Sequence, residues 1–110
     1  MEGWFIEITV YRGVDVDGII AERVARMASL VVATAYGIPV DVNVVEIPAD
    51  SVESREKGLP VVIVNGEVVS EGRVPAVSDL VDAIFHVIGS RAGVPMAYGF
   101  PLVSEEAVIA

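Results

Sequence analysis

The 110-residue sequence predicts a single α/β domain, with a mixed four-stranded sheet flanked by helices. Two stretches in which apolar residues recur at every second position enclose a long stretch with helical spacing, which is the pattern of a β-α-β unit. An Asn65-Gly66 pair then joins two runs rich in valine, which is the strongest short-range signal for a β-hairpin. A second helical stretch follows this hairpin. The expected order is therefore strand, helix, strand, short helix, two strands and a final helix.

The first strand is expected over residues 4–11, where apolar and other residues alternate with a period of two. A loop over residues 12–18 follows, in which Asp15 or Asp17 can cap a helix by accepting hydrogen bonds from its first free N–H groups. The helix itself is expected over residues 19–36. Its buried face is expected to consist of the apolar residues that recur at helical spacing: Ile20, Val24, Met27, Val31 and Ala35.

Further signals along this stretch define the rest of the β-α-β unit. Glu22 and Arg26 are four residues apart, so they are expected to pair on the other side of the helix. Gly37 is expected to end the helix, because glycine readily adopts the left-handed conformation that terminates helices. The second strand is expected over residues 39–47. A strand, a long helix and a strand predict two parallel strands with a right-handed crossover.

The second half of the sequence predicts a hairpin followed by a helix. A short helix that opens with a capping-box pattern is expected over residues 51–57. The hairpin is expected over residues 60–70, with positive φ at both residues of its Asn65-Gly66 turn. The last helix is expected over residues 78–88 and is expected to end at Gly89. Its inward residues are expected to be Val77, Leu80, Val81, Ile84 and Ile88.

Residues 1–90 are expected to form the domain, and residues 91–110 a C-terminal tail. The tail contains glycine and proline but is strongly apolar, so it is expected to pack on its own domain or on a neighbouring copy. The helix over residues 19–36 is also apolar in nearly every direction, which suggests more apolar surface than one sheet can cover. A homo-oligomer, and specifically a two-fold dimer, would bury this surface. The alternative, in which the tail covers it within one chain, stays open.

Charge and cysteine content exclude several classes of function. Seven basic and sixteen acidic side chains give a net charge of −9, and a strongly anionic chain is repelled by phosphate. We therefore expect no nucleic-acid partner and no anionic membrane partner. Cysteine is absent, which excludes disulfides, thiolate metal sites and thiol chemistry. The acidic start and the interrupted apolar stretches fit neither a signal peptide nor a membrane span, so a cytoplasmic protein is expected.

Three motifs carry a resemblance to a known family. The run Tyr11-Arg12-Gly13-Val14-Asp15-Val16-Asp17-Gly18 ends the first strand and opens the long helix. Leu59-Pro60-Val61 opens the third strand, and Gly72-Arg73-Val74 follows the hairpin. With the element order, these motifs resemble the thioredoxin fold in its small glutaredoxin-like version, as found in archaeal-type redox-disulfide proteins. The resemblance covers residues 4–89, and the second half is the more specific match.

The resemblance implies a redox site that has lost its sulfur atoms. In the family, the first strand ends in a Tyr-Gly-x-x-Cys-x-x-Cys run, and here Asp15 and Gly18 stand at the two cysteine positions. Dithiol exchange needs a thiolate nucleophile and a second sulfur to resolve the mixed disulfide. The family's oxidoreductase activity is therefore not expected to carry over, and we expect neither an enzyme nor a cofactor. The resemblance also implies a cis peptide bond before Pro60.

The family's peptide-binding groove is the feature that the resemblance leaves in place. In that groove an extended peptide is held through backbone hydrogen bonds, beside the start of the first helix and the cis-proline. By resemblance, its residues here are Asp15, Gly18, Leu59, Pro60, Gly72 and Arg73. The expected function is a redox-inactive, thioredoxin-like domain that acts as a protein-binding or assembly module.

Other functions remain as alternatives. A thiol cofactor such as glutathione could bind beside Pro60 and make the protein an enzyme, although the carboxylate of Asp15 would raise the thiol pKa, which opposes activation. Asp15 and Asp17 could also contribute oxygen ligands to a hard cation. Helix capping explains them more simply, and no metal site is expected. His86, the only histidine, lies outside the predicted inward stripe and has no recognisable catalytic partner.

Overall fold

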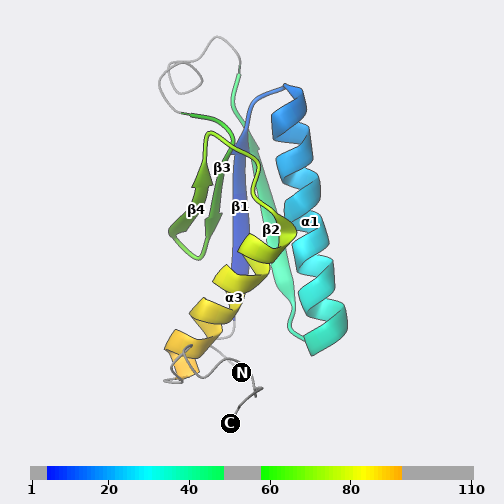
Figure 1. The fold of residues 1–110 in the computed structure, drawn as a ribbon, viewed down its shortest axis with the longest axis vertical. Coiled ribbons are helices and arrows are strands. Elements are labelled where there is room, and N and C mark those ends of the chain that lie inside the picture. The colour runs from blue at the N-terminus through cyan, green and yellow to red at the C-terminus, as the bar shows by residue number, and fades with distance from the viewer. Residues whose placement is uncertain (1–4, 49–57, 93–110) are drawn as a thin grey trace.

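The computed structural model describes residues 5–48 and 58–92 of the chain. These residues form four strands and two helices, labelled as in Figure 1: β1 Ile6–Arg12, α1 Val16–Tyr36, β2 Val40–Glu46, β3 Val61–Val64, β4 Glu67–Glu71 and α3 Val77–Ala92. The short helix expected over residues 51–57 lies outside the described residues, and so does the tail from residue 93 onward.

The four strands form one mixed sheet in the order β2-β1-β3-β4. β1 and β2 are parallel and in unbroken register from Ile6 opposite Val40 to Arg12 opposite Glu46, as expected for a β-α-β unit. β3 pairs antiparallel with β1 on one side and with β4 on the other. The α/β class and the mixed four-stranded sheet flanked by helices are therefore confirmed.

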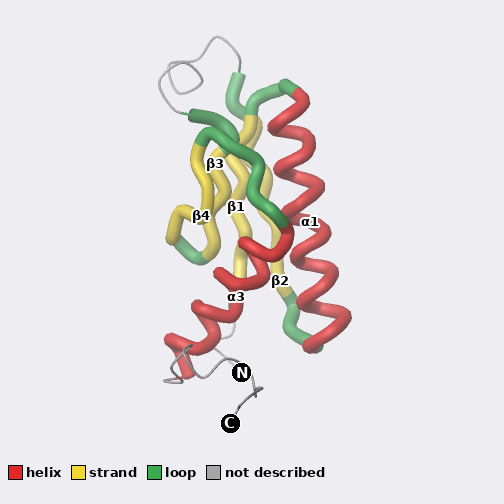
Figure 2. Tube along the Cα trace, viewed as in Figure 1, coloured by secondary structure: helices red, strands yellow, loops and turns green. Residues whose placement is uncertain are grey.

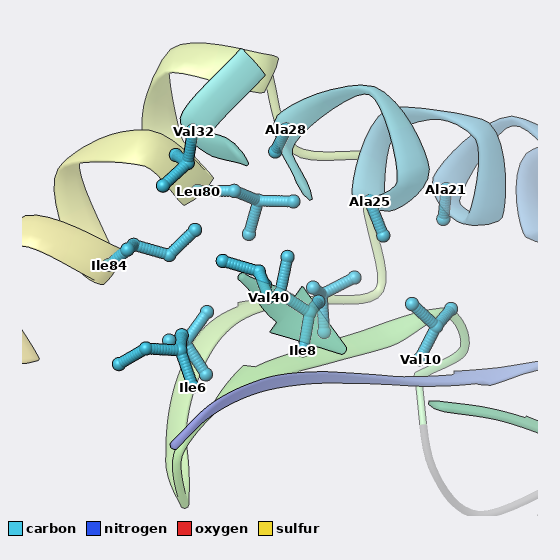
Figure 3. Close-up of a cluster of buried hydrophobic side chains, with 12 residues drawn as sticks. Ile6, Ile8, Val10, Ala21, Ala25, Ala28, Val32, Val40, Leu80 and Ile84 are labelled. Atoms are coloured by element: carbon cyan, nitrogen blue, oxygen red, sulfur yellow. The ribbon is translucent and has the colours of Figure 1, made fainter. Parts of the chain in front are cut away.

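Both helices pack on the same face of the sheet (Figures 2 and 3). Alternate residues of β1 point toward them, and Ile6, Ile8 and Val10 are fully buried. Val62 and Val64 of β3 belong to the same apolar core. Side chains of α1 and α3 pack against these strand residues and complete the core, as Figure 3 shows. None of the helices in the described part of the chain is long and apolar enough to cross a membrane.

The face that α1 buries is not the one that its large residues predict. The expected inward stripe is wrong, because four of its five residues are exposed and the fifth, Val24, is half-buried. The exposed four are Ile20, Met27, Val31 and Ala35. The helix instead turns its small residues to the sheet: Gly18, Ala21, Ala25, Ala28 and Val32. These recur at helical spacing too, and small side chains allow the helix to lie close to the strands.

The two ends of α1 are capped by local interactions. Asp15 is the N-cap, and its Oδ1 accepts a hydrogen bond of 3.0 Å from the backbone N–H of Gly18. The helix therefore begins at Val16, three residues before the predicted start. At the other end Gly37 has a φ of 70° and donates its backbone N–H to the carbonyl of Ala33, as predicted.

The hairpin and α3 follow the prediction with one difference. Asn65 and Gly66 have φ values of 48° and 89°, as the two-residue turn requires. Leu80 and Ile84 of α3 are fully buried, as expected. Gly89, however, does not end α3, which continues to Ala92. Gly89 is not among the described glycines with positive φ, so it adopts ordinary helical geometry there.

Candidate functional site

The predicted site residues come from three loops at one end of the sheet. β1 ends there, β3 begins there and β4 ends there, because β3 runs antiparallel to both neighbours. The expected cis peptide bond between Leu59 and Pro60 is present. A Cβ atom placed on Gly13 would lie 3.9 Å from Cδ1 of Leu59, so the loop that precedes α1 passes close to the residue before Pro60.

The loops around Pro60 and Gly72 pack backbone against backbone. The carbonyl of Pro60, which is buried, accepts a 2.9 Å hydrogen bond from the N–H of Gly72. A Cβ atom on Gly58 would lie 3.3 Å from the Cα of Gly72. Gly72 itself has a φ of 77°, which residues other than glycine rarely adopt. Glycine at these two positions therefore holds the loops together.

Gly18 is required by close packing at the start of α1. A Cβ atom there would lie 2.8 Å from the carbonyl oxygen of Gly13 and 3.0 Å from both Cβ of Arg12 and Oδ1 of Asp15. The nearest of these contacts is with backbone, which cannot move aside like the end of a flexible side chain. The position that resembles the second cysteine of the redox family therefore has no room for a side chain.

Asp15 occupies the N-terminus of α1 with its own carboxylate. The hydrogen bond from Gly18 and the favourable helix dipole account for an aspartate at this position. A thiolate bound there would meet a negative charge instead of free N–H groups, which disfavours activation of a thiol cofactor. Asp17 lies in the first turn and is exposed. Within residues 5–48 and 58–92, no group of three or more acidic or histidine side chains is arranged to hold a metal ion.

Arg73 and His86 lie apart from these contacts. Nη1 of Arg73 is 3.9 Å from Oδ2 of Asp79, and the arginine side chain is 59% exposed. Oδ2 of Asp79 also accepts a hydrogen bond from the N–H of Ala76, so Arg73 extends toward the start of α3. His86 is exposed on α3. The structure thus brings Leu59, Pro60 and Gly72 together and places the start of α1 beside them through Gly13.

A charged network that the sequence analysis missed supports this end of the sheet. Nε of Arg12 donates to Oε1 of Glu22 at 3.0 Å, and Nη1 of Arg12 donates to the carbonyl of Gly13 at 2.8 Å. Arg26 binds the other carboxylate oxygen of Glu22, as its spacing predicts. Hydrogen bonds from Arg26 and Arg12 lower the pKa of Glu22, against the opposing effect of burial. Only the pair within the helix has a signal in the sequence.

An apolar groove begins at Leu59 and extends across the sheet. Its volume is about 490 Å³, and its lining residues are Tyr11, Ile47, Leu59, Val61, Ile63, Val68 and Glu71. Val61 and Ile63 alternate with the buried Val62 and Val64, so this groove lies on the face of the sheet opposite the helices. An extended chain that passed Leu59 would meet an apolar surface there.

No protein-family model matches the chain, and no curated protein sequence matches it either. Function must therefore be inferred from the geometry of this end of the sheet.

Proposed function

We propose that this protein is a redox-inactive, thioredoxin-like domain that binds an extended segment of a partner protein beside Leu59 and Pro60. The observation that carries the proposal is that two loops lie close together: a Cβ atom placed on Gly13, in the loop before α1, would lie 3.9 Å from Cδ1 of Leu59. The β-α-β unit followed by a hairpin and a helix supports the same assignment. The site keeps the loop arrangement of a peptide groove without a reactive sulfur atom.

The groove beside Leu59 indicates what kind of segment would bind. Its lining is mainly apolar, so apolar side chains of the bound segment would gain most from burial there. Glu71 lines the groove, and Asp15 and Asp17 are exposed at the start of α1. With a net charge of −9 on the whole chain, a neutral or basic segment is favoured over an acidic one.

The absence of cysteine and the packing around Gly18 support a binding role instead of a redox role. We expect the protein not to accelerate the reduction of insulin disulfides by dithiothreitol, and a rate above the uncatalysed one would contradict the proposal. Titration calorimetry with glutathione tests the alternative of a thiol-cofactor enzyme. Binding heat would favour that alternative over a redox-inactive module. The cytoplasmic location expected from the sequence belongs to the same proposal.

Binding can be tested with a displayed library of linear seven-residue peptides. We expect the full chain to select peptides rich in apolar and basic residues. Val68→Glu, which adds a carboxylate to the groove, should weaken the selection of apolar residues strongly, because an apolar side chain bound there would remove water from the new carboxylate. Met27→Glu on α1 is the matched control, since Val68 and Met27 are 58% and 56% exposed and Met27 is not among the groove residues. Equal selection by both variants would contradict a site in this groove.

A further inference from the structure

The two edges of the sheet differ in how they are protected against pairing with another strand. β4 has five residues, begins and ends with glutamate, and its register with β3 shifts between Val62 and Ile63. Short length, charged residues and a β-bulge are the usual features that keep an edge strand from pairing with a strand of another chain. β2 has seven residues, four of them valine, and its register with β1 is unbroken. Within the described sheet, β2 is therefore the edge open to another strand.

A groove follows this open edge on the side where α1 lies. Its volume is about 460 Å³, and it is lined by Arg26, Ser29, Leu30, Ala33, Val40, Asp41 and Val42. Leu30 is 65% exposed although it is one of the large apolar residues of the chain. Ser29 Oγ donates a 2.7 Å hydrogen bond to the carbonyl of Val40, so that one carbonyl at the start of the edge already has a partner. Leu30, Ala33 and Val42 present apolar side chains beside the strand backbone, and Arg26 and Asp41 add charge to the lining.

We propose that a second copy of this chain pairs antiparallel with β2, about a two-fold axis at Asn43. This register pairs all seven residues of the strand, with Val42 opposite Val44 and Asp41 opposite Val45 of the partner. Residues directly opposite each other have matching faces, so the core-side valines of the two copies continue one apolar surface. No two acidic side chains are directly opposed. The same patch serves both copies, as a two-fold interface requires.

The position of α1 fits this arrangement. α1 packs against both β1 and β2, so its axis lies above the space between them. Strands are about 4.8 Å apart, so a two-fold axis beside β2 places the two copies of α1 about 10 Å apart. Packed helices have axes about 8–10 Å apart. The dimer would thus join the two sheets and pack the two helices at the same time.

The charges beside the groove are complementary in this register. Glu46 of the partner lies opposite Val40, on the helix side of the sheet, where Arg26 lines the groove. Arg26 donates to Glu22 of its own chain through Nε and Nη2, which leaves Nη1 for a second carboxylate. Arg26 is 57% exposed and Glu46 is 55% exposed. Glu46 approaches Arg12 of its own chain only to 4.0 Å. An ion pair between Arg26 and the partner's Glu46 would set the register of the two strands.

Sedimentation equilibrium of the full chain tests the interface. We expect twice the monomer mass of 11.6 kDa. Ala33→Arg places a long charged side chain in the groove and should raise the dissociation constant of the dimer by at least about tenfold. Ala35→Arg is the matched control, because Ala33 and Ala35 are both exposed on α1 and only Ala33 lines the groove. Unchanged far-ultraviolet circular dichroism would show that both variants fold.

A second variant tests the strand pairing itself. Asn43→Asp changes one exposed side chain to a carboxylate of the same size, which would face its own copy across the axis. We expect a weaker dimer that strengthens again as salt is raised. A monomeric wild-type chain would overturn the proposal, and so would a dimer that withstands both Ala33→Arg and Asn43→Asp. Phe100→Glu, in the C-terminal tail, should leave the dimer intact. If Phe100→Glu dissociates the dimer whereas Ala33→Arg and Asn43→Asp do not, the tail holds the copies together and β2 does not.

This interface uses a different surface from the peptide groove. Loss of the dimer in Ala33→Arg should leave peptide selection unchanged, and loss of selection in Val68→Glu should leave the dimer unchanged. The two proposals can therefore fail separately.

Discussion

The two helices lie on the same face of the sheet but contribute opposite kinds of side chain to the core. α3 buries large residues, Leu80 and Ile84, whereas α1 buries a stripe made almost entirely of alanine and glycine. α1 leaves its large residues exposed, Met27 and Leu30 among them. The comparison teaches that the distance between a helix and a sheet decides which side chains can be buried. A close helix needs small residues, and a more distant one needs large residues to fill the space.

The largest effect expected from this comparison is the loss of a large residue from α3. Leu80→Ala should lower the free energy of unfolding by about 2–5 kcal/mol, because it removes buried apolar volume and leaves a cavity. Met27→Ala on the exposed face of α1 should change it by less than about 0.5 kcal/mol. Urea denaturation at a fixed protein concentration measures both. Similar losses would mean that the exposed face of α1 is as well packed as the core.

The converse substitution tests how close α1 lies to the strands. Ala25→Leu should lower the free energy of unfolding by about 1–3 kcal/mol, because a fully buried alanine is replaced by a residue too large for the space. Ala35→Leu makes the same change at an exposed position of the same helix and should be nearly neutral. Thermal and urea unfolding of the two variants provide the comparison. A stabilised Ala25→Leu protein would show that the alanine stripe leaves unfilled space.

The smallest effect concerns the charged network between α1 and the end of β1. The pKa of Glu22 is lowered below its ordinary value of 4.5, first by the hydrogen bond from Arg26, while burial opposes the shift. The ionised carboxylate therefore adds stability above pH 4.5, and this contribution is lost as the pH falls through the lowered pKa. Glu22→Gln should cost no more than about 1 kcal/mol at neutral pH. That difference from wild type should shrink in acid.

Urea denaturation at several pH values measures this difference. Arg26→Gln provides the control, because it removes the first cause of the lowered pKa and should abolish much of the same pH dependence. A cost of Glu22→Gln that is the same in acid and at neutral pH would show that packing, not charge, is responsible.

Features that depend on a few neighbouring residues were predictable from sequence. The Asn65-Gly66 turn and the Gly37 cap were predicted, and so was a helix cap at Asp15 or Asp17, of which the structure uses Asp15. Each depends on local φ values or on a hydrogen bond within three or four residues. The inward residues Leu80 and Ile84 were predicted for a related reason. On α3 the large apolar residues and the buried face coincide.

Features of the candidate site were predictable only in part. The cis bond before Pro60 was expected from the family resemblance, and residue spacing alone would not have indicated it. The requirement for glycine at position 18 was not foreseen, because it arises from the carbonyl of Gly13 after the chain has turned into α1. The contact of Arg12 with Glu22 was missed for the same reason: the two residues approach only when α1 folds back along β1.

Within residues 5–48 and 58–92, the sequence by itself determined which segments become strands and helices and where the hairpin turns, and its composition determined that no thiol chemistry is available. These properties follow from local backbone preferences and from composition, which do not depend on distant contacts. Tertiary structure decided which face of α1 is buried, that Gly89 stays within α3, and which edge of the sheet is left open. These depend on the separation of packed elements, and that separation is set by all the contacting side chains together.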